Sequence, residues 1–180
     1  MNKILLLKAI NFAAQKHSAQ RRKDSDASPY VNHPVYVAFV LADIGGIDDP
    51  EILAAAVLHD TIEDTDTTRE QLISAFGVRV CKLVEELTDD KSLPKKERKQ
   101  LQLEHAHSLS PKAVLIKLGD KISNIEDITN TPPSGWSIER RREYVDWVES
   151  VIKNCPKAND ALENHFYKVL KLAKQTLNTD

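Results

Sequence analysis

Apolar residues recur through this sequence at the three- and four-residue spacing of an α-helix, and this pattern limits most strongly what the chain can fold into. The apolar stripes cover residues 6–17, 80–87, 114–125 and 162–177. Strands would instead show a sustained alternation rich in β-branched side chains, which the sequence lacks. The pattern therefore predicts an all-α protein.

Residues that favour helix ends divide these stripes into short helices. The predicted helix starts are Pro34, Pro50, Pro94 and Pro111, with N-caps at Asp49 and Ser110 and a capping box formed by Thr67 and Glu70. The predicted stops are Gly45-Gly46, Gly77 and a loop over residues 131–135. We predict one domain over residues 1–180, a bundle of about eight to ten helices, with its core over about residues 5–150 and a last helix at about 157–177.

Composition and charge exclude several classes of protein. The chain has 180 residues and a net charge of −2, whereas a general nucleic-acid binder needs a surplus of Lys and Arg. Its two cysteines, Cys81 and Cys155, form no CxxC pair, which suits a reducing compartment. The N-terminus lacks a signal-peptide cleavage site, and the longest apolar run, residues 52–58, is too short to span a bilayer. We therefore predict a soluble cytoplasmic protein without a nucleic-acid or membrane partner.

A cluster of ionisable residues, HDTIED at 59–64, directly follows the apolar segment ILAAAVL. His59 and Asp60 offer a nitrogen and an oxygen ligand to a divalent metal, and both are costly to bury unless they are paired or ligated. Glu63 and Asp64 follow four residues later, so all four side chains would share one helix surface if the helix continued that far. The segment predicts a metal site; the alternative is an acidic helix end that frays into the next loop.

Two further residues are candidate ligands. His33 precedes Pro34 at the start of an apolar helix, where the alternative is a capping or loop histidine. Asp120 shares a helix face with Lys117 and Asn124, and such a polar stripe is usually the solvated side of a helix. On position alone, Asp120 is better explained as a surface or ion-paired residue. Of the other histidines, we expect packing for His17 and exposure for His105, His107 and His165.

In order, His33, HDTIED and Asp120 resemble the H…HD…D ligand pattern of HD-domain phosphohydrolases. More narrowly, the chain resembles the hydrolase domain of the RelA/SpoT family, with the greatest likeness to its stand-alone members, the small alarmone hydrolases, including the animal SpoT homologue. The matching segments are FAAQKH, QRRKD, PYVNHPVYVA, AAVLHDTIEDTDTT, FGVRVCKLVEELTDDKSLPKKERK, KLGDKISNIEDI and GWSIERRREYVDW.

The resemblance implies an all-helical HD fold that holds one divalent metal ion, usually Mn²⁺. The implied metal ligands are His33, His59, Asp60 and Asp120, and the implied catalytic residues, which orient the attacking water and accept its proton, are Glu63 and Asp64. The implied substrate contacts are Arg22, Lys23, Tyr30, Lys95, Asn124, Arg140 and Tyr144. The implied reaction removes the 3′-diphosphate from guanosine 3′,5′-bis(diphosphate) or its pentaphosphate relative and releases GDP or GTP and pyrophosphate.

Full-length RelA/SpoT enzymes carry a synthetase domain after the hydrolase, and the sequence ends at Asp180, so we expect degradation of the alarmone without synthesis. Two alternatives remain. The protein is a phosphatase for another phosphorylated nucleotide such as NADPH, or it is a metal-free helical module that senses nucleotides. The sequence leaves open the base of the substrate, the physiological metal and the oligomeric state.

Overall fold

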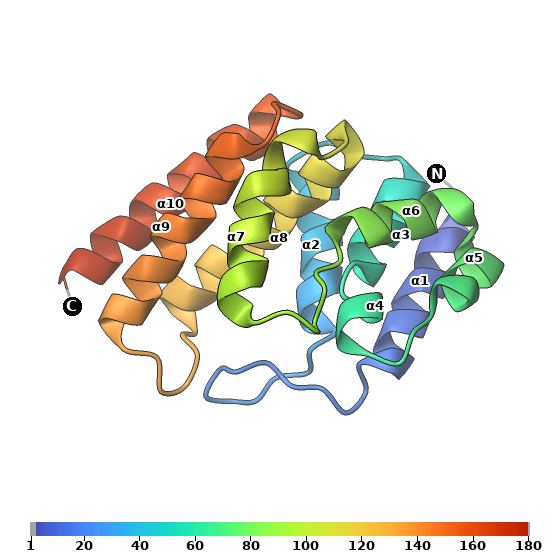
Figure 1. Cartoon of the computed structure of the whole chain (residues 1–180), viewed down its shortest axis with the longest axis horizontal. Coiled ribbons are helices and arrows are strands. Elements are labelled where there is room, and N and C mark those ends of the chain that lie inside the picture. The colour runs from blue at the N-terminus through green and yellow to red at the C-terminus, as the bar shows by residue number, and fades with distance from the viewer. Residues whose placement is uncertain (1–2, 180) are drawn as a thin grey trace.

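A computed structural model of the chain describes residues 3–179, which form ten α-helices and one short 3-10 helix and contain no strand (Figure 1). The prediction of an all-α bundle is confirmed. The helices are α1 (Lys3–Lys16), α2 (Asn32–Asp43), α3 (Pro50–Leu58), α4 (Thr61–Asp64), α5 (Arg69–Phe76), α6 (Val78–Leu87), α7 (Lys95–His105), η1 (Ala106–Ser108), α8 (Pro111–Asn130), α9 (Ile138–Asn154) and α10 (Asp160–Thr179).

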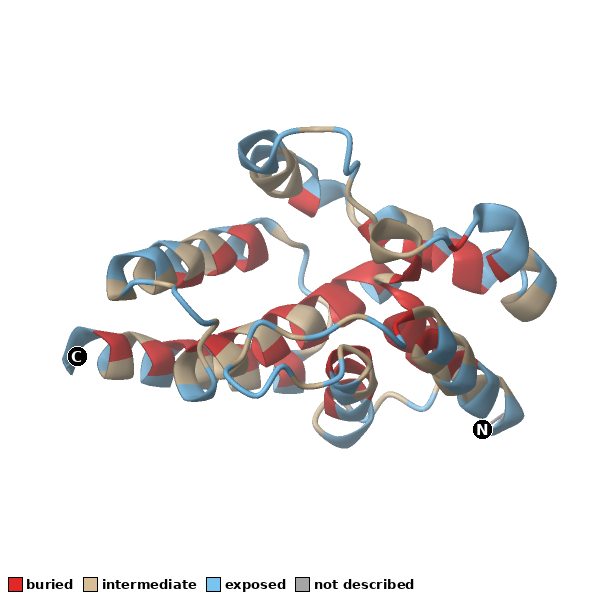
Figure 2. Cartoon of the chain, turned by 90° about the horizontal axis from the view of Figure 1, so that it is seen from below, coloured by how far each residue is buried: buried red, intermediate tan, exposed pale blue. Residues whose placement is uncertain are grey.

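The centre of the bundle is formed by α3 and α8. Every residue from Ile52 to Leu58 in α3 is buried, because a helix that is apolar on all sides must be covered on all sides (Figure 2). Helices α1, α2 and α6 pack around α3, while α2 and α10 pack along α8. The carboxyl end of α3 therefore lies in the interior, and the HDTIED segment leaves the core from that point.

A close approach of α2 and α8 depends on Gly119. A Cβ atom at this position would lie 3.1 Å from Val37 Cγ1 and 3.2 Å from Leu41 Cδ2, which is tighter than ordinary van der Waals contact. Because Gly119 has no side chain, α2 and α8 approach each other closely at the position next to residue 120. This approach brings His33, near the start of α2, within reach of Asp120, in the middle of α8.

Most of the predicted helix ends are confirmed. Pro50 and Pro111 occupy first helical positions, and the Asp49 and Ser110 side chains accept hydrogen bonds from the backbone N–H groups of Glu51 and Ala113. Gly77 ends α5 with a φ of 86°, and residues 131–135 lie in the loop between α8 and α9.

Some predicted ends are wrong by one or more residues. The capping box is formed by Thr68 and Gln71 instead of Thr67 and Glu70, because the Thr67 hydroxyl is buried against Thr65 Oγ1 at 2.7 Å. Pro94 is the N-cap of α7, and Pro34 is the third residue of α2. The last helix is shifted toward the C-terminus and covers residues 160–179.

Two loops lie side by side at one end of the bundle. The loop between α1 and α2 and the loop between α8 and α9 run along the lower edge in Figure 1, and the Ser134 N–H donates a 2.7 Å hydrogen bond to the Lys23 carbonyl. Both loops flank the end of the bundle where the HDTIED segment emerges. Within residues 3–179, no helix combines the length and apolar character needed to cross a membrane.

The histidines outside the predicted metal site are placed largely as expected. His17 is buried, which confirms packing, and His105 and His107 are exposed. His165 is half-buried instead of exposed, because α10 packs along α8 and brings His165 Nε2 to 3.9 Å from Glu126 Oε1.

Candidate metal centre and active site

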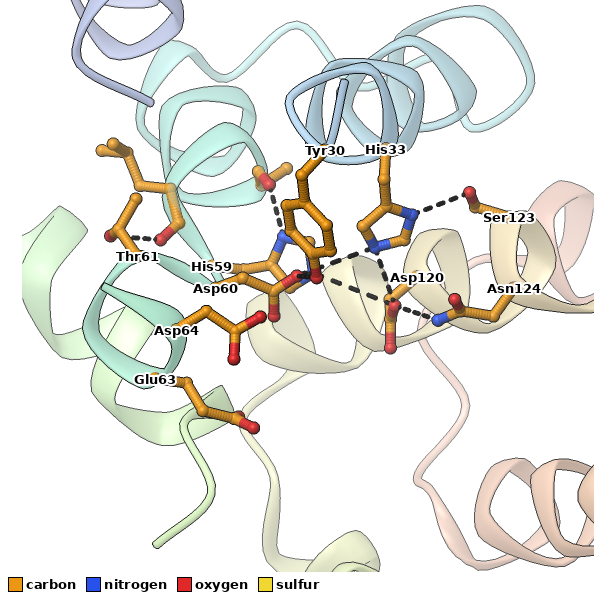
Figure 3. Close-up of polar contacts among 12 residues, drawn as sticks. Tyr30, His33, His59, Asp60, Thr61, Glu63, Asp64, Asp120, Ser123 and Asn124 are labelled. Carbon is orange, nitrogen blue, oxygen red and sulfur yellow. Dashed lines mark hydrogen bonds and ion pairs between the residues drawn. The ribbon is translucent and has the colours of Figure 1, made fainter. Parts of the chain in front are cut away.

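Two histidines and two aspartates meet at one point of the interior (Figure 3). His33 comes from α2, His59 and Asp60 form the turn between α3 and α4, and Asp120 comes from α8. Asp60 Oδ2 is 3.2 Å from His59 Nε2 and 3.8 Å from His33 Nε2. Asp120 Oδ1 is 3.3 Å from His33 Nε2 and 3.8 Å from His59 Nε2. The structure thus brings together the four side chains predicted to bind metal, and we call them the metal centre.

The donor atoms of this centre fit a divalent metal ion. His33, His59 and Asp60 offer ligand atoms that all lie within 4.8 Å of one another. The His59 Nδ1 group donates to the Ala56 carbonyl at 2.7 Å, so Nε2 is the nitrogen that faces the centre, and this buried atom has no hydrogen-bond partner among the described residues. His33 Nδ1 is held in a similar way, 3.0 Å from Ser123 Oγ. Imidazoles oriented through their second nitrogen are typical of metal-binding histidines.

The charges at the centre are strongly coupled. Burial by itself lowers the pKa of His59, but Asp60 and Asp120 outweigh burial and raise the pKa to about 9. Burial raises the pKa of the Asp120 carboxyl, yet the Lys121 ammonium, 3.0 Å from Oδ2, and the two histidines hold that pKa well below its ordinary value. Burial likewise raises the pKa of the Asp60 carboxyl, but the charges of His59 and His33 hold that pKa below its ordinary value. Both carboxylates are therefore ionised at neutral pH and attract a cation.

Tyr30, from the loop before α2, closes one side of the centre. Its hydroxyl donates a 2.6 Å hydrogen bond to Asp60 Oδ2, and its ring packs between His17 and His33 with centroid distances of 4.9 and 5.8 Å. Burial, followed by the charge of Asp60, raises the pKa of the Tyr30 hydroxyl far above its ordinary value. The hydroxyl therefore stays protonated and donates permanently to the carboxylate.

Glu63 and Asp64 lie in α4, beside the centre and on a separate helix from α3 (Figure 3). The single helix surface considered for residues 59–64 does not form, because the chain turns at Asp60 with φ −96° and ψ −2°. Thr61 Oγ1 donates a 2.7 Å hydrogen bond to the Leu58 carbonyl across this turn. The turn directs the metal-centre residues inward and places the two acids at the mouth of the site.

Both acids are held by surrounding donors. Glu63 accepts a 3.1 Å hydrogen bond from the Asp89 N–H, and burial raises the pKa of the Glu63 carboxyl. Asp64 accepts a 3.0 Å hydrogen bond from Gln20 Nε2 and forms an ion pair with Lys91. Glu63 is thus the better proton acceptor of the two on physical grounds, since its neutral form is favoured.

A cavity of about 370 Å³ opens beside the metal centre, and we call it the main cleft. It lies against the two adjacent loops at the end of the bundle. Among the predicted substrate contacts, the lining residues are Arg22, Lys23, Tyr30, Asn124 and Tyr144. Asn124 Nδ2 also donates to Asp120 Oδ1, and Arg22 Nη2 lies 3.4 Å from Asn124 Oδ1, so this lining is continuous with the metal centre.

Lys95 and Arg140, the other two predicted contacts, do not line the cleft directly. They lie over the ring of Trp136, which does, with Lys95 Nζ at 5.5 Å and Arg140 Cζ at 4.2 Å from the ring centre. Burial and then the charges of Arg140 and Lys23 lower the pKa of Lys95. Uncompensated positive charge beside a cavity suits an anionic ligand.

Trp136 is not among the site residues predicted from the sequence, although it lies in a Pro/Gly/Ser loop before a basic helix, which is a signal for a binding residue. The sequence prediction also missed Gln20, Lys117 and Lys121. Lys117 is buried and belongs, with Asp120 and Asn124, to a stripe that points into the site, so the solvated-face explanation of this stripe is wrong. The reason is that α8 lies at the centre of the bundle, where no face is solvent-exposed along its whole length.

The HD domain family matches residues 9–145, a range that contains the whole metal centre, and this match defines the class of protein. Proteins described as guanosine-3′,5′-bis(diphosphate) 3′-pyrophosphohydrolase MESH1 are similar along most of their length. The one from Xenopus tropicalis is 52% identical over 159 residues, which cover 88% of this chain and 89% of the relative. The one from Homo sapiens is 50% identical over 166 residues, which cover 91% and 93%.

A solved structure has the same fold along nearly the whole chain. It is described as a metazoan orthologue of SpoT that hydrolyses ppGpp and plays a role in starvation responses, and it aligns with a TM-score of 0.90 and 43% identity over 93% of this chain and 94% of that chain. The chain belongs to the HD-domain family and, within it, to the stand-alone MESH1 group of the RelA/SpoT family. The resemblance seen in the sequence is confirmed.

Proposed function

We propose that this protein is a hydrolase that removes the 3′-diphosphate of guanosine 3′,5′-bis(diphosphate), with Mn²⁺ as its resident ion. The observation that carries the proposal is the buried His59 Nε2, which makes no hydrogen bond within the described residues and faces Asp60 and Asp120 beside a cleft lined with cations. The relatives that are 50% and 52% identical are described by this reaction. The reaction that describes these relatives therefore agrees with the ligand atoms present at the metal centre.

His33, His59, Asp60 and Asp120 would hold the ion. When bound, a divalent ion supplies Lewis acidity, which polarises phosphoryl oxygens and acidifies water. Two nitrogen and two carboxylate oxygen donors suit Mn²⁺, although other divalent ions would bind the same set.

The remaining chemistry belongs to the side chains around the centre. A water molecule attacks the phosphorus that is bonded to the 3′-oxygen, and Glu63 or Asp64 accepts the proton of that water. The bond between this phosphorus and the 3′-oxygen breaks, and the departing oxygen takes up a proton to become the ribose 3′-hydroxyl. The products are the nucleoside 5′-diphosphate and pyrophosphate. Arg22 and Lys23 in the main cleft neutralise phosphate charge, and Asn124 orients the sugar near Asp120.

A hydrolysis assay with added Mn²⁺ tests the proposal. The parent protein should release pyrophosphate from guanosine 3′,5′-bis(diphosphate), and Asp60→Ala should lose nearly all activity. Asp43→Ala, which removes an exposed carboxylate at the end of α2, is the matched control and should keep full activity. Bound metal is measured in all three proteins by elemental analysis. Equal activity in the parent and Asp60→Ala would refute the metal assignment, and a parent without metal or turnover would favour a nucleotide sensor.

The same assay distinguishes the alternative substrate. NADPH also presents a phosphate group on a ribose, and the cleft residues Arg22 and Lys23 would bind either nucleotide. Comparing kcat/KM for guanosine 3′,5′-bis(diphosphate) and NADPH under identical conditions decides which is the better substrate. We expect the guanosine compound to be preferred.

We also infer that residues 1–180 act as one unit in the cytoplasm. Helix α10 packs along α8 and α9, so it adds to the same bundle that carries the site. The absence of a large excess of Lys and Arg supports a small-molecule nucleotide, instead of a nucleic acid, as the partner.

A further inference from the structure

Lys117 is a largely buried lysine that the proposed reaction does not use. It lies in α8, one turn before Asp120, with only 7% of its surface exposed. Across residues 3–179 its ammonium group makes no hydrogen bond and no ion pair, whereas Lys121, one turn later, is paired with Asp120 at 3.0 Å and lies over Trp147 at 4.9 Å. The side chain is largely buried, but it borders two cavities and no carboxylate is bonded to its nitrogen, so its position suits an anion from outside the chain.

Lys117 stands between two cavities. The first, the metal pocket, has a volume of about 150 Å³ and is lined by the metal-centre residues. The second, about 230 Å³, is enclosed by α7, η1 and the segment after α6, and we call it the rear pocket. Lys117 and Gln102 line both cavities. The main cleft meets the metal pocket elsewhere, at Tyr30 and Asn124.

The three cavities therefore form a series with the metal centre in the middle. A nucleotide in the main cleft would present its phosphorus at the metal centre, and a group beyond that phosphorus would extend toward Lys117. A monophosphate would end at the metal centre. A diphosphate has one further phosphoryl group, which needs both space and positive charge on the far side.

The rear pocket offers hydrogen-bond donors for such a group. Arg98 in its wall lies with Nη1 3.5 Å from Glu63 Oε1, while its buried Nε atom has no hydrogen-bond partner in the described part of the chain. Three carboxylates line the rear pocket, and each accepts a hydrogen bond from a protein group. Asp89 accepts from Gln102 Nε2 at 2.6 Å, Glu86 from Ser110 Oγ at 2.8 Å and Asp90 from Ser92 Oγ at 2.7 Å. Gln102 Oε1 is unpartnered as well and suits a protonated phosphoryl oxygen.

The charge on Lys117 responds to its surroundings. Burial and then the nearby Lys121 charge lower its pKa, and Asp120 and Asp89 oppose this effect. A phosphoryl group at the junction of the two pockets would favour the ammonium form, so binding and charge would support each other.

We propose that the rear pocket is the subsite for the terminal phosphoryl group of a 3′-diphosphate and that Lys117 holds this group, which makes Lys117 a residue that selects diphosphates over monophosphates. The proposal rests on the proposed function, because it takes the reaction at the metal centre as its reference.

The test compares a diphosphate and a monophosphate in two readouts. Isothermal titration measures binding of pyrophosphate and of inorganic phosphate, and kcat/KM is measured for guanosine 3′,5′-bis(diphosphate) and for guanosine 5′-diphosphate 3′-monophosphate. Lys117→Gln should weaken pyrophosphate binding and diphosphate turnover by about 10- to 100-fold while changing the monophosphate values by less than about threefold. Lys112→Gln removes an exposed charge from the first turn of the same helix and should change nothing.

The outcomes separate the two proposals. A parent that is inactive on guanosine 3′,5′-bis(diphosphate) refutes the proposed function whatever Lys117 does. An active parent that binds pyrophosphate no more tightly than phosphate overturns the rear-pocket subsite, and this measurement needs no variant. A Lys117→Gln or Lys117→Met protein that keeps the parent's diphosphate preference overturns the role of Lys117. If Lys117→Gln does not fold, Lys117→Met is expected to, because it removes a buried charge and keeps the apolar stem.

Discussion

The Tyr30 hydroxyl donates a 2.6 Å hydrogen bond to Asp60 Oδ2, and this contact connects the loop before α2 with the turn that follows α3. Asp60 is also 3.2 Å from His59 Nε2, so one carboxylate oxygen faces both a fixed donor and a candidate metal ligand. The orientation of this carboxylate therefore depends on a residue outside the metal centre. Residues that orient ligands in this way affect metal affinity nearly as strongly as some ligands do.

We expect Tyr30→Phe to weaken Mn²⁺ binding by about 10- to 100-fold, because Asp60 would lose the donor that orients it. Titration of metal-free protein with Mn²⁺ measures this change. Tyr36→Phe is the matched control, since the Tyr36 hydroxyl donates to Glu126 at 2.9 Å on an exposed surface. Equal Mn²⁺ affinity in Tyr30→Phe and the parent would show that the hydrogen bond does not position Asp60.

Gln20 is expected to position Asp64 through a fixed amide. His17 Nδ1 lies 2.6 Å from Gln20 Oε1, which orients the amide so that Nε2 donates to Asp64 at 3.0 Å. Gln20→Met should lower kcat by about 5- to 10-fold with little change in KM, because one hydrogen bond to a catalytic acid is lost. Gln100→Met, at an exposed position of α7, is the control.

A double variant shows whether Gln20 acts through Asp64. In Asp64→Asn, the further change Gln20→Met should have almost no effect on kcat, since residues that act as one unit are not additive. Additive losses would mean that Gln20 contributes by another route.

The ionisation of Glu63 is expected to reduce the stability of the metal-free protein. Burial raises the pKa of Glu63 in the folded state, so the folded protein binds this proton more tightly than the unfolded chain does. The free energy of unfolding therefore falls as the pH rises from the ordinary glutamate range through the raised pKa. Glu63→Gln removes this loss, so the metal-free variant should have a higher Tm than the parent at pH 8.

The Tm difference should shrink as the pH falls below about 4, where Glu63 becomes protonated in the unfolded chain as well. Thermal unfolding across this pH range measures it. The same variant should lose about 10²- to 10⁴-fold in kcat as a proton acceptor is removed. A variant that is less stable than the parent at pH 8 would contradict the role of burial.

Trp136 is expected to position two cations for the substrate phosphates. Because Lys95 and Arg140 both lie over its ring, Trp136→Leu should raise KM by about 10-fold with a smaller effect on kcat. Trp136→Phe keeps an aromatic face and should lose less. Steady-state kinetics on both variants measures this, and an unchanged KM in Trp136→Leu would mean that the ring does not place these charges.

Much of the fold was readable in the sequence, because helix formation depends on local spacing and on capping chemistry. The apolar run at 52–58 predicted a buried helix, and the Asp49–Pro50 and Ser110–Pro111 pairs predicted helix starts. The predicted capping box was wrong by one residue, because the Thr67 hydroxyl is hydrogen-bonded to the Thr65 hydroxyl instead of capping the helix. Local competition of this kind depends on side-chain geometry that spacing does not encode.

By itself, the sequence determined the helical class and the presence of His59 and Asp60 at the end of an apolar helix. Only the tertiary structure decided that Asp120 faces them. The stripe that contains Asp120 has the spacing of a solvated helix face, and periodicity defines a face without saying what covers it. The close approach of α2 and α8 at Gly119 covers this face and brings Asp120 to 3.3 Å from His33. The metal centre therefore forms from residues distant in sequence, and it depends on packing that local spacing does not determine.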